Sequence, residues 1–434
     1  MYESVDVDAR SRVASHGNAR PRASAAVLGA GAAFEDVLAV GRPNIPDKAA
    51  FLARVEGMVD ARQLTNHGPM VRRFEAQVAE ISGVRHCVAT CNGTQGLDLA
   101  IEALGLAGEV IVPSFTFVAS VHALWRRGVR PVFCDVDPRT HTLDPARVEE
   151  AVTPRTTGIL AVALWGDHGH EGALRRIADR HGLRLLSDGA HAFACDRASA
   201  PRACEAEVLS FHATKCVNAL EGGAILTDDD ALAERLRLMV NFGFSGEDAV
   251  ECCGTNAKMT EACAAMGLTS LEARDEIFAR NRHNHRAYRE GLAGVPALRV
   301  LTPDPGLRHN RHYVVVEVDA AAAGLDRDEI VGALRLENVL ARRYFHPGCH
   351  RMEPYAGLPS GRPLPVTERL AAEVMVLPNG LAVAPADASL LASRVATLVE
   401  RAAEVRAALA ACDDPRLPAF ARRHPVARPR KERA

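Results

Sequence analysis

The sequence has little of several features that mark specialised classes of protein. Aromatic residues make up 5% of its 434 residues, and the formal net charge is −2. A chain this close to neutrality gives no electrostatic argument for binding nucleic acid. No apolar run reaches the roughly 18 residues that a membrane helix needs, and the N-terminus lacks a compact apolar signal sequence. We therefore expect a cytoplasmic protein with neither a membrane nor a nucleic-acid partner.

Cysteine pairs are also missing. The 11 cysteines are an odd number and include no C-x-x-C pair, which suits the reduced thiols of a cytoplasm better than a disulfide framework. His346 and His350 have a spacing that a metal site could use. A complete set of ligands is not evident around them, so we predict no metal site.

The sequence contains enough apolar residues for a large core, since 48% of the residues are hydrophobic. Short apolar runs alternate with helical patterns as far as residue 227, and several are apolar throughout, as is typical of strands covered on both faces. We predict an α/β protein with a mostly parallel seven-stranded sheet between helices, in which one antiparallel strand is plausible. The predicted strands are 86–90, 110–112, 130–134, 158–163, 184–187, 207–211 and 223–227.

Periodicity predicts helices and a division of the chain. The predicted helices are 47–61, 71–82, 95–104, 120–127, 145–151, 172–181, a short one near 191–200, 229–239, 260–290, 327–337 and 386–411. Strand-like runs at 313–318 and 339–343 indicate a smaller α+β domain late in the chain. We predict a disordered leader (1–38), a large domain (39–292), a small C-terminal domain (293–412) and a basic disordered tail (413–434).

Lys215 is the residue around which the chemistry can be organised. It follows the predicted strand 207–211, among small polar residues. Burial there would lower its pKa, because the charged form loses hydration. A neutral amine can attack an aldehyde or ketone and form a Schiff base. Taken alone, the pattern equally suits an exposed lysine in a loop.

Three further features follow predicted strands. Gly93 and Thr94 follow 86–90, where a small residue and the free N–H groups of a helix start can cradle an anion, although a plain turn fits as well. Phe117 follows 110–112 and could stack on a flat ring, although such aromatics are usually core. Asp188 follows 184–187 and could pair with a cationic ring nitrogen or cap a helix. With Lys215, these form the set that pyridoxal phosphate (PLP) requires.

These motifs resemble those of the sugar-nucleotide aminotransferases of the DegT–StrS group, which are PLP enzymes of fold type I, like aspartate aminotransferase. The likeness covers about residues 40 to 395. Its most specific parts are 92–94, 113–117, 188–192, 210–215, 221–223 and 254–259, with 365–368 and 377–378 late in the chain.

The resemblance implies roles for single residues. Lys215 would form the internal aldimine, and Asp188 would pair with the pyridine nitrogen. The other implied cofactor contacts are the ring stacking of Phe117, the phosphate contacts of Gly93, Thr94 and Ser210, and His191 near the ring hydroxyl. Asn256 matches an asparagine that reaches the phosphate of the neighbouring subunit, which implies a homodimer with shared active sites.

The sequence departs from the family pattern at three positions. Ser187 stands where the family often has an acid before the key aspartate. Lys258 replaces the arginine of Asn-x-Arg-Met, and these two cations are not interchangeable at a bidentate contact. Ala163 replaces the histidine of His-x-aromatic-Gly, which removes a polar group near the site.

The function that the resemblance implies is transamination. L-glutamate would convert PLP to pyridoxamine phosphate, and the amine would then pass to a nucleotide-linked keto sugar, with Lys215 as general base and then acid. Loops 64–69 and 241–244 resemble the branch that converts dTDP-4-keto-6-deoxyglucose to dTDP-4-amino-4,6-dideoxyglucose. A C3 aminotransferase acting on a dTDP-3-keto sugar is the nearest alternative. The expected substrate contacts are Asn66, His67, Phe242, Tyr344, His346 and His350.

Two other classes were weighed. A PLP-dependent sugar dehydratase on the same fold would have histidine in place of Lys215 or would add an iron–sulfur cluster, and the sequence shows neither. A regulator without turnover would need an added DNA-binding domain. Residues 1–38 are too short and too unpatterned for a helix-turn-helix.

Overall fold

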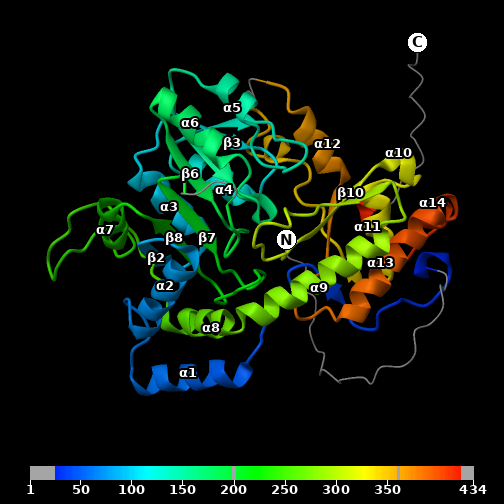
Figure 1. Cartoon of the computed structure of the whole chain (residues 1–434), viewed down its shortest axis with the longest axis horizontal. Coiled ribbons are helices and arrows are strands. Elements are labelled where there is room, and N and C mark those ends of the chain that lie inside the picture. Colours follow the sequence, from blue (N-terminus) through cyan, green and yellow to red (C-terminus); the bar gives the residue numbers. More distant parts are fainter. Residues whose placement is uncertain (1–24, 198–201, 359–361, 422–434) are drawn as a thin grey trace, which may run out of the picture.

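A computed structural model describes residues 25–197, 202–358 and 362–421 of the chain. A large sheet with helices on both faces forms one part, and a smaller sheet with its own helices forms the other (Figure 1). The long helix α9 (Arg274–Leu292) runs from the first part to the second.

The large sheet has seven strands in the order β2-β8-β7-β6-β5-β3-β4. They are β2 (His86–Thr90), β3 (Glu109–Pro113), β4 (Arg130–Cys134), β5 (Thr156–Val162), β6 (Arg184–Asp188), β7 (Ala206–Ser210) and β8 (Gly223–Thr227). β8 is antiparallel to both of its neighbours, and the other pairings are parallel. The sheet is therefore mixed, and the seven strands predicted from the sequence are all present.

Helices cover both faces because successive strand residues point to opposite sides. In β2, Val88 packs in the same cluster as α3 (Gly93–Ala103), α4 (Val118–Arg126) and α7 (Asp230–Met239). Cys87 and Ala89 face α2 (Pro69–Ser82) and α8 (Glu261–Glu272). Farther along that face lie α5 (Pro145–Ala151) and α6 (Glu171–His181). Helix α1 (Lys48–Asp60) packs outside α8.

The smaller sheet is antiparallel, with the order β12-β10-β9. Its strands are β9 (Leu298–Val300), β10 (Val314–Val318) and β12 (Val374–Leu377), and a parallel pair joins β1 (Leu38–Ala39) to β11 (Val339–Leu340). The helices of this part are α10 (Ala320–Ala323), α11 (Arg327–Leu336), α12 (Pro365–Glu373), α13 (Pro385–Glu400) and α14 (Ala402–Ala410). The sequence did not predict β9, α10, α12 or β12, which are short.

Some predicted helix boundaries need correction. The helix expected at 260–290 breaks at Ala273 into α8 and α9, and the one expected at 386–411 breaks at Arg401 into α13 and α14. No helix forms at 191–197, and residues 198–200 of that prediction lie outside the described residues.

The expected disorder of both ends is wrong for the parts that the structure describes. Ala25, Phe34 and Leu38 are buried against the core of the smaller part, and β1 adds a strand there. At the other end, Leu417 and Ala421 are buried in the same core. The apolar side chains of these segments did not give a recognisable helical or strand period because each segment is short. Residues 1–24 and 422–434 lie outside the described residues.

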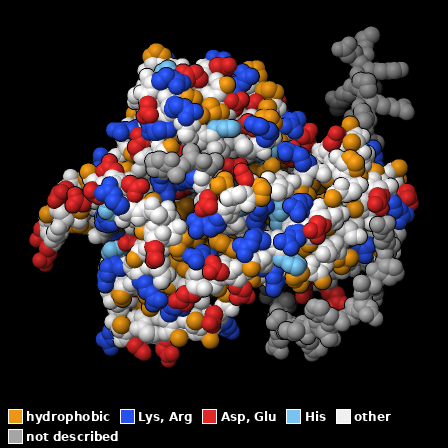
Figure 2. All heavy atoms as spheres, viewed as in Figure 1, with side chains coloured by type: hydrophobic (Ala, Val, Ile, Leu, Met, Phe, Trp, Pro, Cys, Tyr) orange, Lys and Arg blue, Asp and Glu red, His pale blue; other side chains and the backbone are white. Residues whose placement is uncertain are grey.

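None of the described helices combines the length and the apolar character that crossing a bilayer requires. Over the face shown in Figure 2, Lys and Arg side chains are interspersed with Asp and Glu, and hydrophobic side chains lie scattered between them. The cytoplasmic location stays a prediction.

Candidate active site

The predicted residues gather where several strands of the large sheet end. Asp188 is the last residue of β6, and Ser210 is the last residue of β7. Gly223 pairs with both Ser210 and Thr90, the last residue of β2. The turn after β2 therefore lies beside the loop that carries Lys215. Crevices at the carboxyl ends of strands are where open α/β sheets bind ligands.

The turn after β2 forms a tight cradle. The side chain of Asn92 caps α3 by accepting a hydrogen bond from the N–H of Gln95 at 2.9 Å. The helix start leaves the N–H groups of Gly93 and Thr94 without partners inside the helix. A Cβ atom at Gly93 would lie 3.2 Å from Cβ of Ser210. The geometry thus brings Gly93, Thr94 and Ser210 together around a group of N–H and hydroxyl donors suited to an anion.

Lys215 and Asp188 form a buried, oppositely charged pair of groups. Nζ of Lys215 donates to the hydroxyl of Tyr313 at 3.4 Å. Burial lowers the pKa of Lys215 to about 8, while the nearby Asp188 carboxylate opposes that change. Burial also raises the pKa of Asp188, because the carboxylate loses hydration. The amine can therefore lose its proton near neutral pH, and the carboxylate lacks a full complement of cationic partners.

The hydrogen bonds of Asp188 reveal a residue that the sequence analysis missed. Oγ of Ser120 donates to the carboxylate at 2.7 Å, and the N–H of Ala190 donates at 3.1 Å. Ser120 lies in the first turn of α4, three residues after Phe117. Phe117 caps that helix and is 57% exposed, so its ring stands on the open side of the turn that contacts Asp188. In the sequence, the only indication that Ser120 belongs to the site is its position three residues after Phe117.

His191 lies against the same group of residues. Its Nδ1 accepts a hydrogen bond from the N–H of Trp165 at 3.3 Å, and its ring centroid lies 4.3 Å from that of Tyr313. Burial holds the pKa of His191 well below its usual value, so the ring is neutral at pH 7. Tyr313, the first residue of the predicted strand 313–318, was also missed, because its contact with Lys215 depends on the tertiary fold.

The expected substrate residues of the smaller part separate into two groups. The ring of Tyr344 lies 6.4 Å from that of Tyr313, which places it beside the Lys215 group. His346 is exposed and donates to the carbonyl of Ala371. His350 bonds to Oγ of Ser114 at 2.6 Å, at the end of β3. Neither histidine contacts Lys215, and the described residues contain no group of three or more metal-ligating side chains.

The remaining predicted residues lie in two exposed loops. Asn66 and His67 adopt left-handed backbone conformations just before α2 and line a cavity of about 160 Å³ together with Lys258. Phe242 is 46% exposed, and Asn256 is exposed where it pairs with Asn241. The loop after α7 stands out from the body of the molecule (Figure 1). Within one chain, the structure does not bring these residues into contact with Lys215.

One of the three departures, Lys258, has a visible side-chain role. Nζ of Lys258 donates to Oδ1 of Asn241 at 2.6 Å and lies 5.0 Å from the ring centroid of Phe242. It holds the exposed loop together as a single point charge, without the two-pronged contact an arginine offers. The N–H of Ala163 donates to the carbonyl of Asp188 at 2.9 Å. Ser187 is buried within β6.

Comparison with known proteins gives consistent matches over most of the chain. The DegT/DnrJ/EryC1/StrS aminotransferase family matches residues 46–396. The chain is 36% identical over 348 residues to a dTDP-4-amino-4,6-dideoxy-D-glucose transaminase of Shigella dysenteriae, covering 80% of this chain and 94% of that protein. It is 38% identical over 321 residues to the erythromycin biosynthesis sensory transduction protein EryC1 of Saccharopolyspora erythraea, covering 72% and 86%.

Among solved structures, the chain is similar to DesI, crystallised in the presence of its TDP-sugar product. The TM-score is 0.84 with 50% sequence identity, covering 88% of this chain and 98% of DesI. A second similar structure is PseC of Helicobacter pylori, an aminotransferase of pseudoaminic acid biosynthesis, with a TM-score of 0.78, covering 84% of this chain and 100% of PseC. At 23% identity, the second likeness supports the fold alone.

Proposed function

We propose, from the premise that the chain belongs to the DegT/DnrJ/EryC1/StrS aminotransferase family, that it uses PLP to aminate a nucleotide-linked keto sugar at C4. The observation that carries this proposal is the buried pair of Lys215 and Asp188 at the ends of adjacent strands. The substrate would be dTDP-4-keto-6-deoxyglucose, and the amino donor would be L-glutamate. The fold would be fold type I.

The residues present fit PLP on three independent features. The buried carboxylate of Asp188 has hydroxyl and amide donors, and the cationic nitrogen of a pyridine ring would complete its partners. The cradle of Gly93, Thr94 and Ser210 is tight, with Cβ of Ser210 3.2 Å from a Cβ atom placed at Gly93, and it presents donors to a phosphate. Lys215 has the lowered pKa that an amine needs in order to attack an aldehyde. The cofactor would supply an electron sink for charge that develops on the substrate carbon.

The chain would do four things around that group. Asp188 would hold a positive charge on the pyridine nitrogen, and the cradle would anchor the phosphate. Phe117, exposed at the start of α4, would cover one face of the ring. Nζ of Lys215 would take a proton from the substrate carbon and return it elsewhere, which an amine with a pKa of about 8 can do in both directions near neutral pH.

The C4 position is supported by the relatives. The transaminase of Shigella dysenteriae is named for a 4-amino-4,6-dideoxy sugar, which supports C4. DesI was crystallised in the presence of its TDP-sugar product, which supports a nucleotide-linked sugar. The name of EryC1 refers to sensory transduction, which would fit a regulator without turnover. The presence of Lys215 in its buried pair favours turnover over that reading.

The proposal includes a homodimer in which each active site uses both subunits. Asn66, His67, Phe242 and Asn256 are exposed. The apolar side chains of Phe242, Phe244 and Val250 are also exposed on the same protruding loop. A second subunit that covers them would bury these side chains and bring Asn256 to its cofactor.

The direct test is an absorbance spectrum of the purified protein with PLP, followed by L-glutamate and then dTDP-4-keto-6-deoxyglucose. We expect a visible band that glutamate removes and the keto sugar restores. A band that returns only with a dTDP-3-keto sugar would overturn the C4 assignment. A band that glutamate leaves unchanged would overturn glutamate as the donor, and no band at all would overturn the cofactor proposal.

A further inference from the structure

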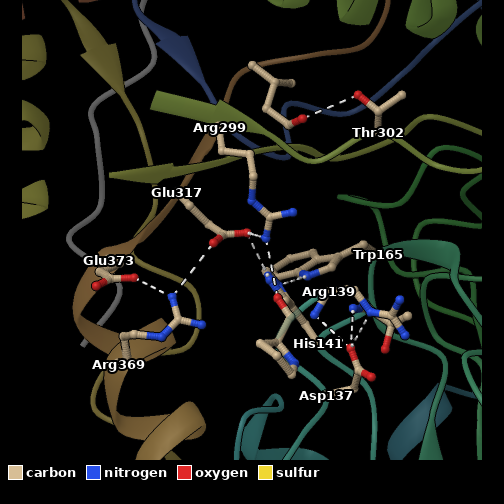
Figure 3. A network of polar contacts seen from close by, with 12 residues as sticks. Asp137, Arg139, His141, Trp165, Arg299, Thr302, Glu317, Arg369 and Glu373 are labelled. Carbon is tan, nitrogen blue, oxygen red and sulfur yellow. Dashed lines mark hydrogen bonds and ion pairs between the residues drawn. The ribbon is translucent and has the colours of Figure 1, made fainter. Parts of the chain in front are cut away.

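A line of polar contacts runs from Glu317 of the smaller sheet through His141 to Trp165 (Figure 3). Glu317 lies on β10, and its carboxylate contacts Nε2 of His141 at 3.1 Å. Nε1 of Trp165 donates to Nδ1 of the same histidine at 3.1 Å. His141 precedes α5 and Trp165 follows β5, so the line crosses from the smaller part of the molecule to the larger one.

The chemistry of the two ends sets the proton position on His141. An indole N–H can only donate, so Nδ1 of His141 must accept. The proton therefore resides on Nε2 and faces Glu317. The pKa of Glu317 lies below its usual value, because His141 and Arg299 stabilise the carboxylate against the effect of burial. His141 itself is buried, with 1% exposure.

Trp165 connects His141 to His191. Its backbone is left-handed, with φ of 61°, a conformation that a bulky residue adopts only when its surroundings enforce it. Its indole ring stacks on the ring of His191, with centroids 5.8 Å apart and 22° between the planes. Its backbone N–H donates to Nδ1 of His191. Nδ1 is thus an acceptor there too, and the proton of the neutral ring resides on Nε2.

The second ring nitrogen of His191, Nε2, is the one available to a ligand. Among the described residues, none forms a hydrogen bond with its Nε2. The ring lies against Tyr313, which accepts the hydrogen bond from Lys215. A donor in this position suits an oxygen substituent on the ring of a bound cofactor.

We propose that His141 is a positioning residue that, through Trp165, fixes His191 as an Nε2–H donor to the ring oxygen of PLP. This inference rests on the proposed function, because it needs the cofactor. It has a structural consequence: the contact between β10 and the large part also sets the geometry of His191. The sequence gives no sign of this link, since residues 141, 165, 191 and 317 share no motif.

The test compares His141→Phe with His170→Phe as a matched control. His170 bonds to Asp137 at 3.3 Å near the same network but has no contact with Trp165. PLP is titrated into each apo-protein, and its Kd is measured from the visible absorbance band. We expect about tenfold weaker binding for His141→Phe, which corresponds to the loss of one hydrogen bond of about 1.4 kcal/mol, and less than about twofold for the control.

A double-mutant cycle separates positioning from general destabilisation. In a His191→Phe background, we expect His141→Phe to weaken PLP binding by less than about twofold further, because the residue that it positions is gone. Two independent, multiplicative losses would overturn the proposal. If His141→Phe fails to fold, Trp165→Phe takes its place, since it removes the indole N–H and keeps an aromatic ring. Failure of the wild type to bind PLP would instead overturn the proposed function.

Discussion

The interior of the site and the two exposed loops differ in how completely one chain builds them. Asp188, Ser210 and Lys215 are held by strand ends and by hydrogen bonds to residues that are themselves buried. Asn66, Phe242 and Asn256 lie in loops and are exposed. A single chain brings the residues of the first set together, whereas the residues of the second set lie on its surface.

This difference indicates which part of the chemistry a single subunit can support. Binding and activating a cofactor requires buried charges, which the sheet edge supplies. The loop residues, by contrast, are exposed in the single chain. Variants of the interior residues and of the loop residues test this comparison separately.

Lys215→Ala should have the largest effect. The variant loses the amine that both binds the cofactor and moves the proton, so we expect turnover to fall by at least about 10⁴-fold. PLP should still bind, without the band that the wild type shows. Steady-state kinetics and absorbance spectra measure both effects, with circular dichroism as the folding control. Retained turnover would remove Lys215 from the centre of the site.

Asp188→Asn should lower kcat by about 10²- to 10³-fold, because a neutral amide cannot hold a positive charge on the ring nitrogen. Ser120→Ala is the matched comparison, since it removes one donor and keeps the carboxylate. We expect a smaller loss for it, about tenfold. Kinetics at saturating PLP measure both variants. Equal losses would mean that Asp188 acts through packing and not through its charge.

Asn256→Ala tests the loops, with an expected loss of PLP affinity of about 10- to 100-fold. Mixing it with Lys215→Ala makes the test specific to a shared site. A heterodimer would contain one site with the lysine of one subunit and the asparagine of the other, so mixing should restore about a quarter of the wild-type activity by random assortment of subunits. No recovery, with mixed dimers verified by two affinity tags, would place Asn256 at the site of its own subunit.

The pH dependence of cofactor capture should change least. The folded pKa of Lys215 is lowered to about 8, so its neutral fraction rises about tenfold between pH 7 and pH 9 and then levels off. An exposed lysine would continue to gain reactivity until about pH 10.5. Stopped-flow growth of the visible band in the apo-protein measures the rate, with Lys215→Ala as the blank. A rate that still rises steeply above pH 9 would contradict the buried environment.

Much of the large sheet could be predicted from the sequence, because strands covered on both faces are uniformly apolar. His86–Thr90, Arg130–Cys134 and Gly223–Thr227 were predicted with the bounds that the structure shows. The folded segments at residues 25–39 and 413–421 were missed. Their few apolar residues, such as Phe34 and Leu417, gain meaning only from the distant core that they cover.

The kinds of functional group at the site could be predicted from the sequence: an amine, a carboxylate, small residues and an aromatic ring, each following a predicted strand. Only the tertiary structure decided that Ser120 donates to Asp188, that Tyr313 meets Lys215, and that Trp165 and His141 support His191. The physical reason is distance along the chain. Local periodicity reports on neighbours within a helix or strand, whereas these contacts join residues 24 to 98 positions apart and exist only after the sheet and its helices have packed.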